Sequence, residues 1–415
     1  MAHSKAIAQY LTRYAEPEAN AATRLITRSY RHCLVVPCFD EHPGFLAQLI
    51  AHLPDPADLL IILIVNAPSC AADLPLHRTR KLLTELVSAS RVLADSGHLT
   101  WREMTTGIDL LICNRTTVEL LLPRRQGVGL ARKIGADMGL ALISTGKIEL
   151  PWIFNTDADA ILPHDYLGAI NNQTDGTLVY PFTHLSCDEE DLNRRMRAYE
   201  LHLRYYVDRL AWAGSPYAYH TLGSLIAVHA DTYARVRGFP RRNAAEDFYL
   251  LNKVAKTAPL ITPPHPVVQL QTRWSERVPF GTGPALARDG PQHTYAPASF
   301  ELLKEVIDYL NALAVDEPRT LSANVKPLAG DLGLLDFCVT AVRQYQPGSS
   351  RRIALHSWFD AFRTLRFIHA ARSLAADQPV ANVMQSLFSG SDEPLESLIR
   401  RSHSSVSHGM RSLSA

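Results

Sequence analysis

Two acidic motifs in this 415-residue chain have the composition and spacing of chemical sites, and the first is Asp157-Ala158-Asp159. Two carboxylates one residue apart can hold a hard divalent cation through oxygen and leave positions open for the oxygens of a diphosphate. The plainer interpretation is a solvated turn or a helix cap. An apolar stretch runs up to Asp157, and Leu162-Pro163 follows Asp159. This setting, a strand end followed by a break, favours the metal site.

The second acidic motif is Glu246-Asp247, which follows Gly238-Phe239-Pro240 and opens an apolar helical stretch. A carboxylate that projects from the start of a helix into a cleft suits a general base, which takes the proton from an acceptor hydroxyl. The plainer interpretation is a pair of acidic residues that stabilise a helix N-terminus. A third pair, Glu190-Asp191, lies in the charge run CDEED and is interpreted in that plainer way.

Three arginines are candidates for binding phosphate oxygens. Arg273 and Arg277 follow the last expected strand and lead into Gly281-Thr282-Gly283. Guanidinium groups suit phosphate geometry, and a loop of small residues lets backbone amides approach an anion. Arg132, near the start of the helical stretch 127–142, is the third candidate. The alternative for Arg273 and Arg277 is a pair of exposed arginines in surface ion pairs.

His265 lies between two prolines and is a candidate third metal ligand, although a histidine in such a place is more often merely exposed. Other catalytic motifs are absent from the sequence. Gly127-Val128-Gly129 lacks the third glycine of a dinucleotide fingerprint, and there is no GxxxxGK[ST], HExxH or GxSxG. Dinucleotide redox chemistry, P-loop phosphoryl transfer, zinc proteolysis and serine hydrolysis are therefore disfavoured.

The elements that must position these residues alternate between apolar strands and amphipathic helices. Strands are expected at 32–39, 59–68, 108–114, 151–160 and 267–274, helices at 44–53, 76–94, 127–142, 163–172 and 188–213, and a strand followed by two helices at 220–255. This alternation implies a mostly parallel sheet covered on both faces by helices. Ligands of such sheets bind beyond the carboxyl ends of the strands, where Asp40, Glu41, Asn66 and Asp157 fall.

The same pattern divides the chain into three parts. Residues 1–30 are expected to form an N-terminal helical extension, 31–290 the α/β domain, and 298–415 a helical C-terminal region. That C-terminal region contains no motif, and its plainest role is a helical cap that completes the core. One alternative is a lid or an acceptor-binding domain. Another brings its basic residues against an anionic membrane where a lipid-linked acceptor would lie, namely Arg351, Arg352, Arg400, Arg401 and Arg411.

Composition narrows the class of protein further. Lys and Arg (42) nearly balance Asp and Glu (41), so the excess of basic charge on which general nucleic-acid binding depends is missing. The six cysteines form no CxxC pair, which disfavours a zinc ribbon or a small disulfide framework. The start of the chain is polar, and the apolar run 59–65 is far shorter than the ~20 residues of a membrane helix. We expect a soluble, cytoplasmic protein.

Taken in order, four segments resemble the GT-A glycosyltransferases, specifically the large inverting family 2. They are VVPCFDE (35–41), GLARKIGAD (129–137), NTDAD (155–159) and GFP…AAEDF (238–248). The first looks like the VIPxYNE segment of that family, and the second like its ARNxG helix just ahead of the metal motif. The resemblance covers about 31–283 and depends on order and spacing more than on any single motif.

This resemblance implies the fold, the donor and the site. It implies a GT-A type α/β fold with a mostly parallel mixed sheet, a nucleotide-diphosphate sugar donor, and Mn²⁺ or Mg²⁺ held at Asp159 with Asp157 near the ribose or the metal. Asp247 would be the general base with Glu246 beside it, in a direct displacement at the anomeric carbon. Arg273 would stabilise the leaving diphosphate. The residues expected against the nucleotide are Pro37, Asp40, Glu41 and Asn66.

Two departures from the family pattern bear on specificity. Asn66-Ala67-Pro68-Ser69 stands where the family usually has Asp-Asp-Gly-Ser, so an amide rather than a carboxylate would meet the nucleotide base. Gln271-Thr272-Arg273-Trp274 is one residue short of the Gln-x-x-Arg-Trp motif of processive members, and no membrane helix is expected after it. The sequence therefore favours an enzyme that adds one sugar.

Two alternatives stay open at the level of sequence. A sugar-phosphate nucleotidyltransferase shares a related sheet, but the GxGxR signature of such enzymes is missing from 32–45. A non-catalytic sugar-nucleotide-binding relative would keep the fold without turnover, and the presence of Asp157, Asp159 and Asp247 counts against it. The sequence does not select among a glycan, a lipid-linked and a small-molecule acceptor.

Overall fold

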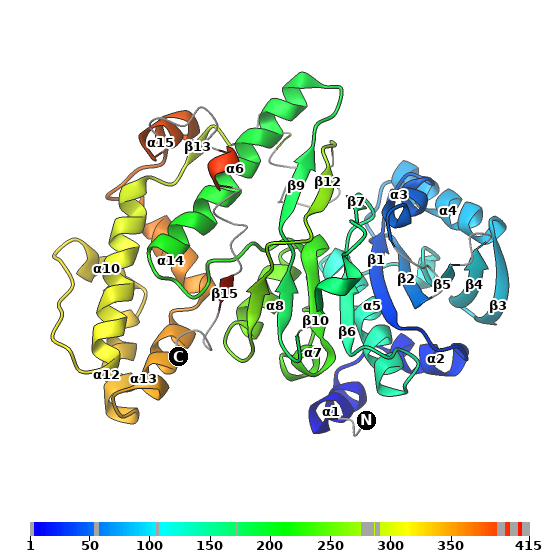
Figure 1. Cartoon of the computed structure of the whole chain (residues 1–415), viewed down its shortest axis with the longest axis horizontal. Helices are drawn as coiled ribbons and strands as arrows, with labels where there is room; N and C mark the ends of the chain where they lie inside the picture. Colours follow the sequence, from blue (N-terminus) through cyan, green and yellow to red (C-terminus); the bar gives the residue numbers. More distant parts are fainter. Residues whose placement is uncertain are drawn as a thin grey trace.

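In the computed structural model of the chain, a large mixed sheet lies at the centre, with helices around it and a helical region at one end (Figure 1). The structure describes residues 4–53, 58–104, 108–170, 173–274, 286, 291–387, 395–398 and 406–408. Arg277 and Gly281-Thr282-Gly283 lie outside the described residues, as do Arg400, Arg401 and Arg411.

The main sheet has ten described strands in the order β15-β11-β8-β10-β6-β1-β2-β5-β4-β3. Their bounds are β1 His32–Cys38, β2 Leu59–Asn66, β3 Ser90–Ser96, β4 Leu99–Met104, β5 Asp109–Arg115, β6 Trp152–Asn155, β8 Thr177–Val179, β10 Ile226–His229, β11 Leu260–Thr262 and β15 Val406–His408. Strands β4, β10 and β15 run against the other seven, so the sheet is mostly parallel, as the sequence predicts.

The centre of the sheet is parallel and apolar. Strand β1 pairs with β2 from His32↔Leu59 to Cys38↔Val65, and with β6 on its other side. Every residue of β1 and β2 is buried, which explains why both strands are continuous apolar runs rather than alternating ones. The carboxyl ends of β1, β2 and β6 therefore lie together at one edge.

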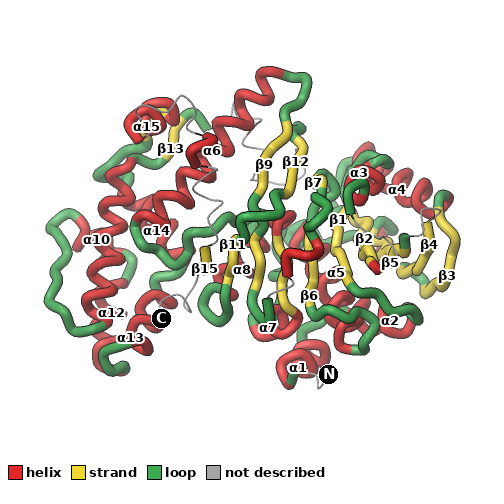
Figure 2. The backbone as a smooth tube through the Cα atoms, viewed as in Figure 1, coloured by secondary structure: helices red, strands yellow, loops and turns green. Residues whose placement is uncertain are grey.

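Helices from the first part of the chain flank this sheet (Figure 2). They are α1 Lys5–Arg13, α2 Pro17–Leu25, α3 Phe45–Ile50, α4 Asp73–Ser88 and α5 Gly127–Ser144. Helix α5 packs on β1, β2 and β6 and is buried along most of its length, and α2 and α1 pack on α5. The segment at 1–30 is thus joined to the helix that carries Arg132.

Three sequence predictions of elements differ from the structure. The helix expected over 76–94 ends at Ser88, because the chain from Ser90 onwards forms β3, which pairs with β4 across a turn where Gly97 has a φ of 68°. The strand expected over 151–160 is interrupted by the turn at 156–159 and continues as β7 Ala160–Ile161. The stretch 163–172 contains the short 3₁₀ helix η3 Leu167–Ile170 instead of an α-helix.

A second, three-stranded sheet stands beside the main one in the order β7-β12-β9. Strand β9 (Phe182–Leu185) runs parallel to β12 (Val268–Gln271), which pairs antiparallel with β7. Leu270 lies opposite Ala160 in this pairing, so the end of β12 comes close to the Asp157–Asp159 turn. The block 220–255 forms η4 Gly223–Leu225, β10, α7 Ala230–Arg235 and α8 Glu246–Val254, as predicted.

The long helix α6 (Glu190–Trp212) contacts the C-terminal helices (Figure 1). Those helices are α10 Pro297–Ala314, α11 Val325–Asp331, α12 Leu334–Gln344, α13 Ser349–Trp358, α14 Ala361–Ala371 and α15 Val380–Leu387, with a small ladder of β13 His293–Thr294 and β14 Gln378–Pro379. They enclose an apolar core of their own, to which Tyr205 and Leu210 of α6 also contribute.

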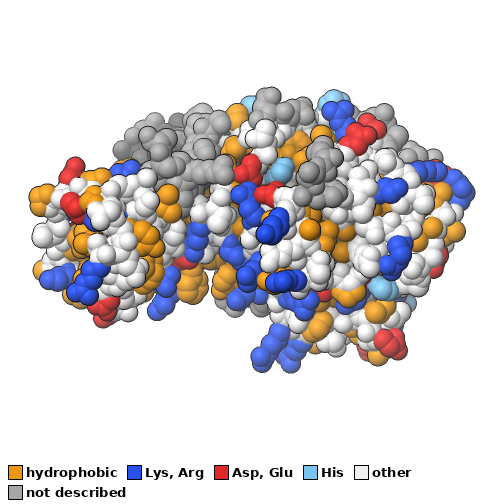
Figure 3. All heavy atoms as spheres, turned by 90° about the horizontal axis from the view of Figure 1, so that it is seen from below, with side chains coloured by type: hydrophobic (Ala, Val, Ile, Leu, Met, Phe, Trp, Pro, Cys, Tyr) orange, Lys and Arg blue, Asp and Glu red, His pale blue; other side chains and the backbone are white. Residues whose placement is uncertain are grey.

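Arg351 does not belong to an exposed basic surface. Only 3% of it is exposed, and it donates to the backbone oxygens of Tyr345 and Leu313 and pairs with Asp316. On the face shown in Figure 3, Lys and Arg side chains occur in several separate groups with hydrophobic side chains between them. Within the described residues, each helix is too short or too polar to cross a membrane.

Candidate active site

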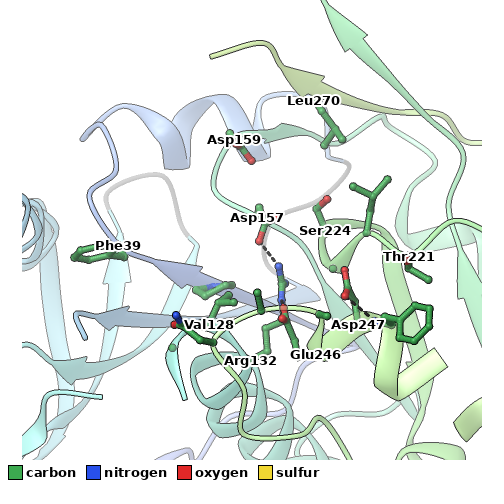
Figure 4. A pocket seen from close by; sticks show the side chains of 18 of the residues that line it. Phe39, Val128, Arg132, Asp157, Asp159, Thr221, Ser224, Glu246, Asp247 and Leu270 are labelled. Atoms are coloured by element: carbon green, nitrogen blue, oxygen red, sulfur yellow. Dashed lines mark hydrogen bonds and ion pairs between the residues drawn. The ribbon is translucent and has the colours of Figure 1, made fainter. Parts of the chain in front are cut away.

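A cavity of about 560 Å³ opens at the carboxyl ends of β1, β2 and β6. Predicted site residues that line it are Pro37, Glu41, Asn66, Arg132, Asp157, Asp159, Glu246, Asp247 and Arg273. Figure 4 shows their arrangement: Phe39 lies at one end, Asp157 and Arg132 in the middle, and Asp247 towards the other end beside Thr221. Residues from six separate stretches of the chain thus meet in one place.

Arg132 forms the centre of the site. Its Nε donates to Glu246 Oε1 at 2.8 Å, and its Nη2 donates to Asp157 Oδ1. Burial works against the charge on Arg132, but the two carboxylates outweigh this effect and raise the pKa of the guanidinium above its ordinary value. The arginine is therefore a fixed cation between the first and the second acidic motif (Figure 4).

Arg273 forms a second cationic centre, which joins the loop after β1 to the turn at 156–159. It pairs with both carboxylate oxygens of Glu41, at 2.8 and 3.1 Å, and its Nη2 lies 2.8 Å from Asp159 Oδ2. Burial again opposes the charge, and Glu41 and Asp159 raise the pKa of Arg273 above its ordinary value. In this structure each aspartate of the 157–159 motif thus faces one arginine.

Asp247 has the most perturbed carboxyl group of the cavity. Burial raises its pKa to about 7, and the neighbouring charge of Glu246 acts in the same direction. The amide of Phe248, which donates to Asp247 Oδ1 at 2.7 Å, and Arg132 limit the rise. A carboxylate with a pKa near neutrality accepts a proton far more readily than an ordinary aspartate does.

A strained turn sets the direction of this carboxyl group. Ala245, directly before α8, has a φ of 59°, a left-handed conformation that is unusual for a residue with a side chain. Such strain is concentrated at functional sites, where the surrounding structure maintains it. The turn places Glu246 and Asp247 in the first turn of α8, and both line the cavity.

Helix α5 is anchored on the side opposite to Arg132 by a buried polar cluster around Asp137. Asp137 accepts hydrogen bonds from the hydroxyls of Tyr10 and Tyr233, at 2.7 and 2.8 Å. Lys133 donates to Asp137, to the Tyr10 hydroxyl and to the backbone oxygen of Tyr14. The cluster joins α1 and α7 to α5 and so fixes the helix from which Arg132 projects.

Close backbone approaches hold the Arg132 side chain from the other side. A Cβ atom on Gly223 would lie 2.6 Å from Nη2 and 2.7 Å from Cζ of Arg132. A Cβ atom on Gly129 would lie 2.6 Å from the backbone oxygen of Pro240. The absence of side chains at both positions lets the segment before α8 and the segment before β10 close around α5.

The opposite end of the cavity combines Pro37, Phe39, Asn66 and Pro68. The Asn66 amide nitrogen donates to the backbone oxygens of Ile64, at 2.9 Å, and Cys38, at 3.3 Å. With its nitrogen committed to these strand ends, Asn66 has its side-chain oxygen left as an acceptor for a ligand. Phe39 adds an aromatic face to this end (Figure 4).

Some predicted residues lie elsewhere. Asp40 is not among the lining residues, because its carboxylate pairs with Arg78 of α4, at 2.5 and 2.8 Å, and its φ of 57° turns it away from the path of β1. His265 is exposed in the segment before β12, whereas Asp159 lies at the far end of that strand. His265 therefore does not line the cavity and is not a ligand beside Asp159 in this structure.

Several lining residues carried no signal in the sequence. His184 of β9 is nearly buried, and its Nδ1 lies 2.7 Å from Glu200 Oε2 of α6. Glu200 also pairs with Arg204, and these partners outweigh burial and hold its pKa below the ordinary value. The segment around β9 was not predicted as a strand. The pairing of β9 with β12, which brings His184 to the cavity, could therefore not be predicted either.

The cavity offers two carboxylates to a divalent metal. Asp157 and Asp159 offer hard oxygen donors to the same cavity, and each already stabilises a positive charge, that of Arg132 or Arg273. This donor set suits Mn²⁺ or Mg²⁺ when phosphate oxygens complete the coordination. Among the described residues, three protein ligand atoms converge at Glu18, His98 and Cys113, which do not line this cavity, and there Glu18 already pairs with Arg115.

Comparison with known proteins leaves the family open. No family model matches the chain, and no curated protein matches it. Among solved structures, the chain is similar to the mannosyltransferase PcManGT from Pyrobaculum calidifontis in complex with GDP-Man and Mn²⁺. The identity is 17% and the TM-score 0.36, over 96% of this chain and 91% of that one. At this identity and TM-score the likeness does not extend to function.

Proposed function

We propose that this chain is a glycosyltransferase of GT-A type that moves a sugar from a nucleotide-diphosphate donor to an acceptor hydroxyl. One observation carries the proposal: a single cavity has three parts in sequence. These are an aromatic end at Phe39, a centre of paired arginines and carboxylates, and the Asp247 carboxyl group, whose pKa is about 7. This order corresponds to the order of base, diphosphate and acceptor in the reaction. The resemblance of the sequence to the inverting family 2 supports the same assignment.

The donor would bind across the first half of the cavity, within the segment 31–290. Phe39 and Pro37 offer a flat apolar surface to the nucleotide base, and Asn66 an amide oxygen. Arg132 and Arg273 would bind the diphosphate oxygens, because a guanidinium matches the geometry of a phosphate group. Their present carboxylate partners hold both groups in position before the donor arrives.

Asp157 and Asp159 would hold the divalent metal, Mn²⁺ or Mg²⁺. When bound, the ion offsets the negative charge that develops on the leaving diphosphate. The arginines do the same from the protein side, since both keep their charge throughout. Glu41 and Glu246 would act as positioning residues, because each orients one of these arginines.

Asp247 would take the proton from the acceptor hydroxyl. The acceptor oxygen then forms a bond to the anomeric carbon, while the bond from that carbon to the diphosphate oxygen breaks and the diphosphate leaves with the electron pair. The resemblance to the inverting family 2 supports attack on the face of the anomeric carbon opposite to the leaving diphosphate, which would invert the anomeric configuration. With a pKa near neutrality, Asp247 is ionised in part at pH 7 and binds the proton firmly enough to promote attack.

A second candidate, a sugar-nucleotide-binding protein without turnover, is favoured by the pairing of both metal-motif aspartates with arginines. The experiment that separates the two begins with calorimetric titration of UDP, GDP and TDP, with Mn²⁺ and with EDTA. The transferase requires metal-dependent binding of one diphosphate that is lost in Asp159→Ala. Absence of binding by all three nucleotides would contradict both candidates.

Turnover is then measured by donor consumption with the nucleotide that binds. A loss of turnover in Asp247→Asn, with diphosphate binding retained, supports the transferase. The binding protein is supported if the wild-type chain binds the nucleotide diphosphate but consumes no sugar donor of that nucleotide with any of a panel of acceptors. The nucleotide that binds also identifies the base, which selects the sugars to be screened.

A further inference from the structure

A second, smaller cavity of about 80 Å³ adjoins the acceptor end of the main one. The two cavities share the wall residues Tyr199, Thr221, Leu222 and Phe248. The remaining walls come from α6, from the segment before η4 and from α14, namely Leu203, Tyr206, Val207, Leu210, Tyr217, Tyr219, His220, Ala361 and Thr364. We call this smaller cavity the aromatic chamber.

The lining of the aromatic chamber differs in chemistry from that of the main cavity. Its described walls include no Asp, Glu, Lys or Arg, and consist mainly of aromatic rings and aliphatic side chains. Among its polar groups, the Tyr217 hydroxyl donates to the backbone oxygen of His356 at 2.9 Å, whereas the buried Thr364 hydroxyl has no hydrogen-bond partner within the described residues. A charged or strongly hydrated group would lose its water here without gaining a charged partner. An apolar group would be favoured.

The chamber is held in a fixed relation to Asp247. Phe248, which belongs to both cavities, is the next residue, and its amide donates to the Asp247 carboxylate at 2.7 Å. An acceptor hydroxyl at Asp247 therefore lies beside the shared wall. The apolar side of the main cavity continues in the same direction through Leu365 and Phe362 of α14, of which Phe362 is 43% exposed at the rim.

We propose that the acceptor carries an apolar alkyl or aryl group close to its reacting hydroxyl, and that this group binds in the aromatic chamber. The reaction itself rests on the function proposed above, whereas the chamber's preference for an apolar group does not. A volume of 80 Å³ equals that of roughly three waters at about 30 Å³ each, which is the size of a short alkyl chain. A second sugar ring, which is larger and hydrated on all sides, would not enter.

The test uses two probes that differ only in the apolar part, methyl β-D-glucoside and n-butyl β-D-glucoside. Their affinities for the full chain are measured by calorimetry. We expect the butyl compound to bind on the order of 50-fold more tightly, because its three additional CH₂ groups leave water. Ala361→Leu and Val207→Phe fill the chamber from opposite walls, α14 and α6, and should each abolish this preference. Ala370→Leu, on α14 outside the lining, should keep it.

Two results would overturn the proposal. One is equal affinity of the two glucosides for the wild-type chain. The other is an unchanged butyl preference in a filled variant that melts at the wild-type temperature. If either Ala361→Leu or Val207→Phe does not fold, the butyl preference of the other variant, on the opposite wall, is the test. Nucleotide-diphosphate binding, measured on the same preparations, separates this proposal from the proposed glycosyltransferase function. If no nucleotide diphosphate binds but the butyl preference remains, the glycosyltransferase is contradicted, whereas the assignment of the aromatic chamber to an apolar group stands.

Discussion

The pH dependence of turnover follows directly from the environment of Asp247. A general base acts only in its ionised form, and burial places the pKa of this carboxyl at about 7. At pH 7 about half of the molecules have the ionised form, at pH 6 about a tenth and at pH 5 about a hundredth. We therefore expect kcat/KM to fall tenfold for each pH unit below 7, and to level off above pH 8.

Two variants test this reasoning. Asp247→Asn removes the base and should lower kcat by about 10²–10⁴-fold while nucleotide binding is retained. Glu246→Gln removes the neighbouring negative charge that helps to raise the pKa of Asp247, so the acidic limb of the profile should move to lower pH. Initial rates are measured from pH 5 to 9 by release of the nucleotide diphosphate. A wild-type profile that is flat between pH 5 and 7, or an active Asp247→Asn variant, would refute the assignment.

Stability provides an independent check on the same carboxyl group. Because its pKa is raised on folding, the native state binds the proton more tightly than the unfolded chain does, and stability is lost as pH rises towards and through 7. Asp247→Asn removes this penalty. Its melting temperature should exceed that of the wild type at pH 8, and the difference should shrink at pH 4. A lower melting temperature at pH 8 would show that the ionised carboxylate is stabilised by its surroundings.

Two further predictions concern how Arg132 is held. Asp137→Ala leaves the buried charge of Lys133 with only the longer 3.8 Å contact to Glu16 and should lower the free energy of unfolding by about 3–5 kcal/mol, measured by urea denaturation. The double variant with Lys133→Met should recover part of this loss, and additive losses would exclude a coupled pair. Gly223→Ala places a Cβ atom 2.6 Å from Arg132 Nη2 and should weaken diphosphate binding. Gly330→Ala is the control, because its Cβ atom would meet nothing nearer than 3.9 Å, and it should leave binding unchanged. Equal diphosphate binding by both variants would show that the Arg132 side chain adapts to the added methyl group.

The positions of the central strands along the chain and the convergence of their ends could be predicted, because buried parallel strands are continuous apolar runs and their carboxyl ends meet at one edge. This was sufficient to place Glu41, Asn66 and Asp157 in one cavity. The pairing of each aspartate with an arginine was not predictable. Arg132 and Asp157 are 25 residues apart, and their contact depends on how α5 is seated on the sheet.

The short strands and the small sheet also escaped prediction. Strands β8 and β9 have three and four residues, too few for a pattern to appear. Their pairing with β10 and β12 is decided by contacts between distant parts of the chain. His184 reaches the cavity only through this pairing, and Asp40 misses it because Arg78 of α4 binds its carboxylate. Neither interaction has a local signature in sequence.

The cavity wall formed by α14 is separated in sequence from the residues proposed to bind the donor. The groups assigned to the donor all precede residue 275, whereas Phe362 and Leu365 come from a helix almost ninety positions later. Exchanging only the cavity-facing side chains of α14 would reshape the acceptor end and leave the donor half of the sequence untouched. For the proposed glycosyltransferase, the range of acceptors could therefore change through substitutions in α14 while the nucleotide-sugar donor stays the same.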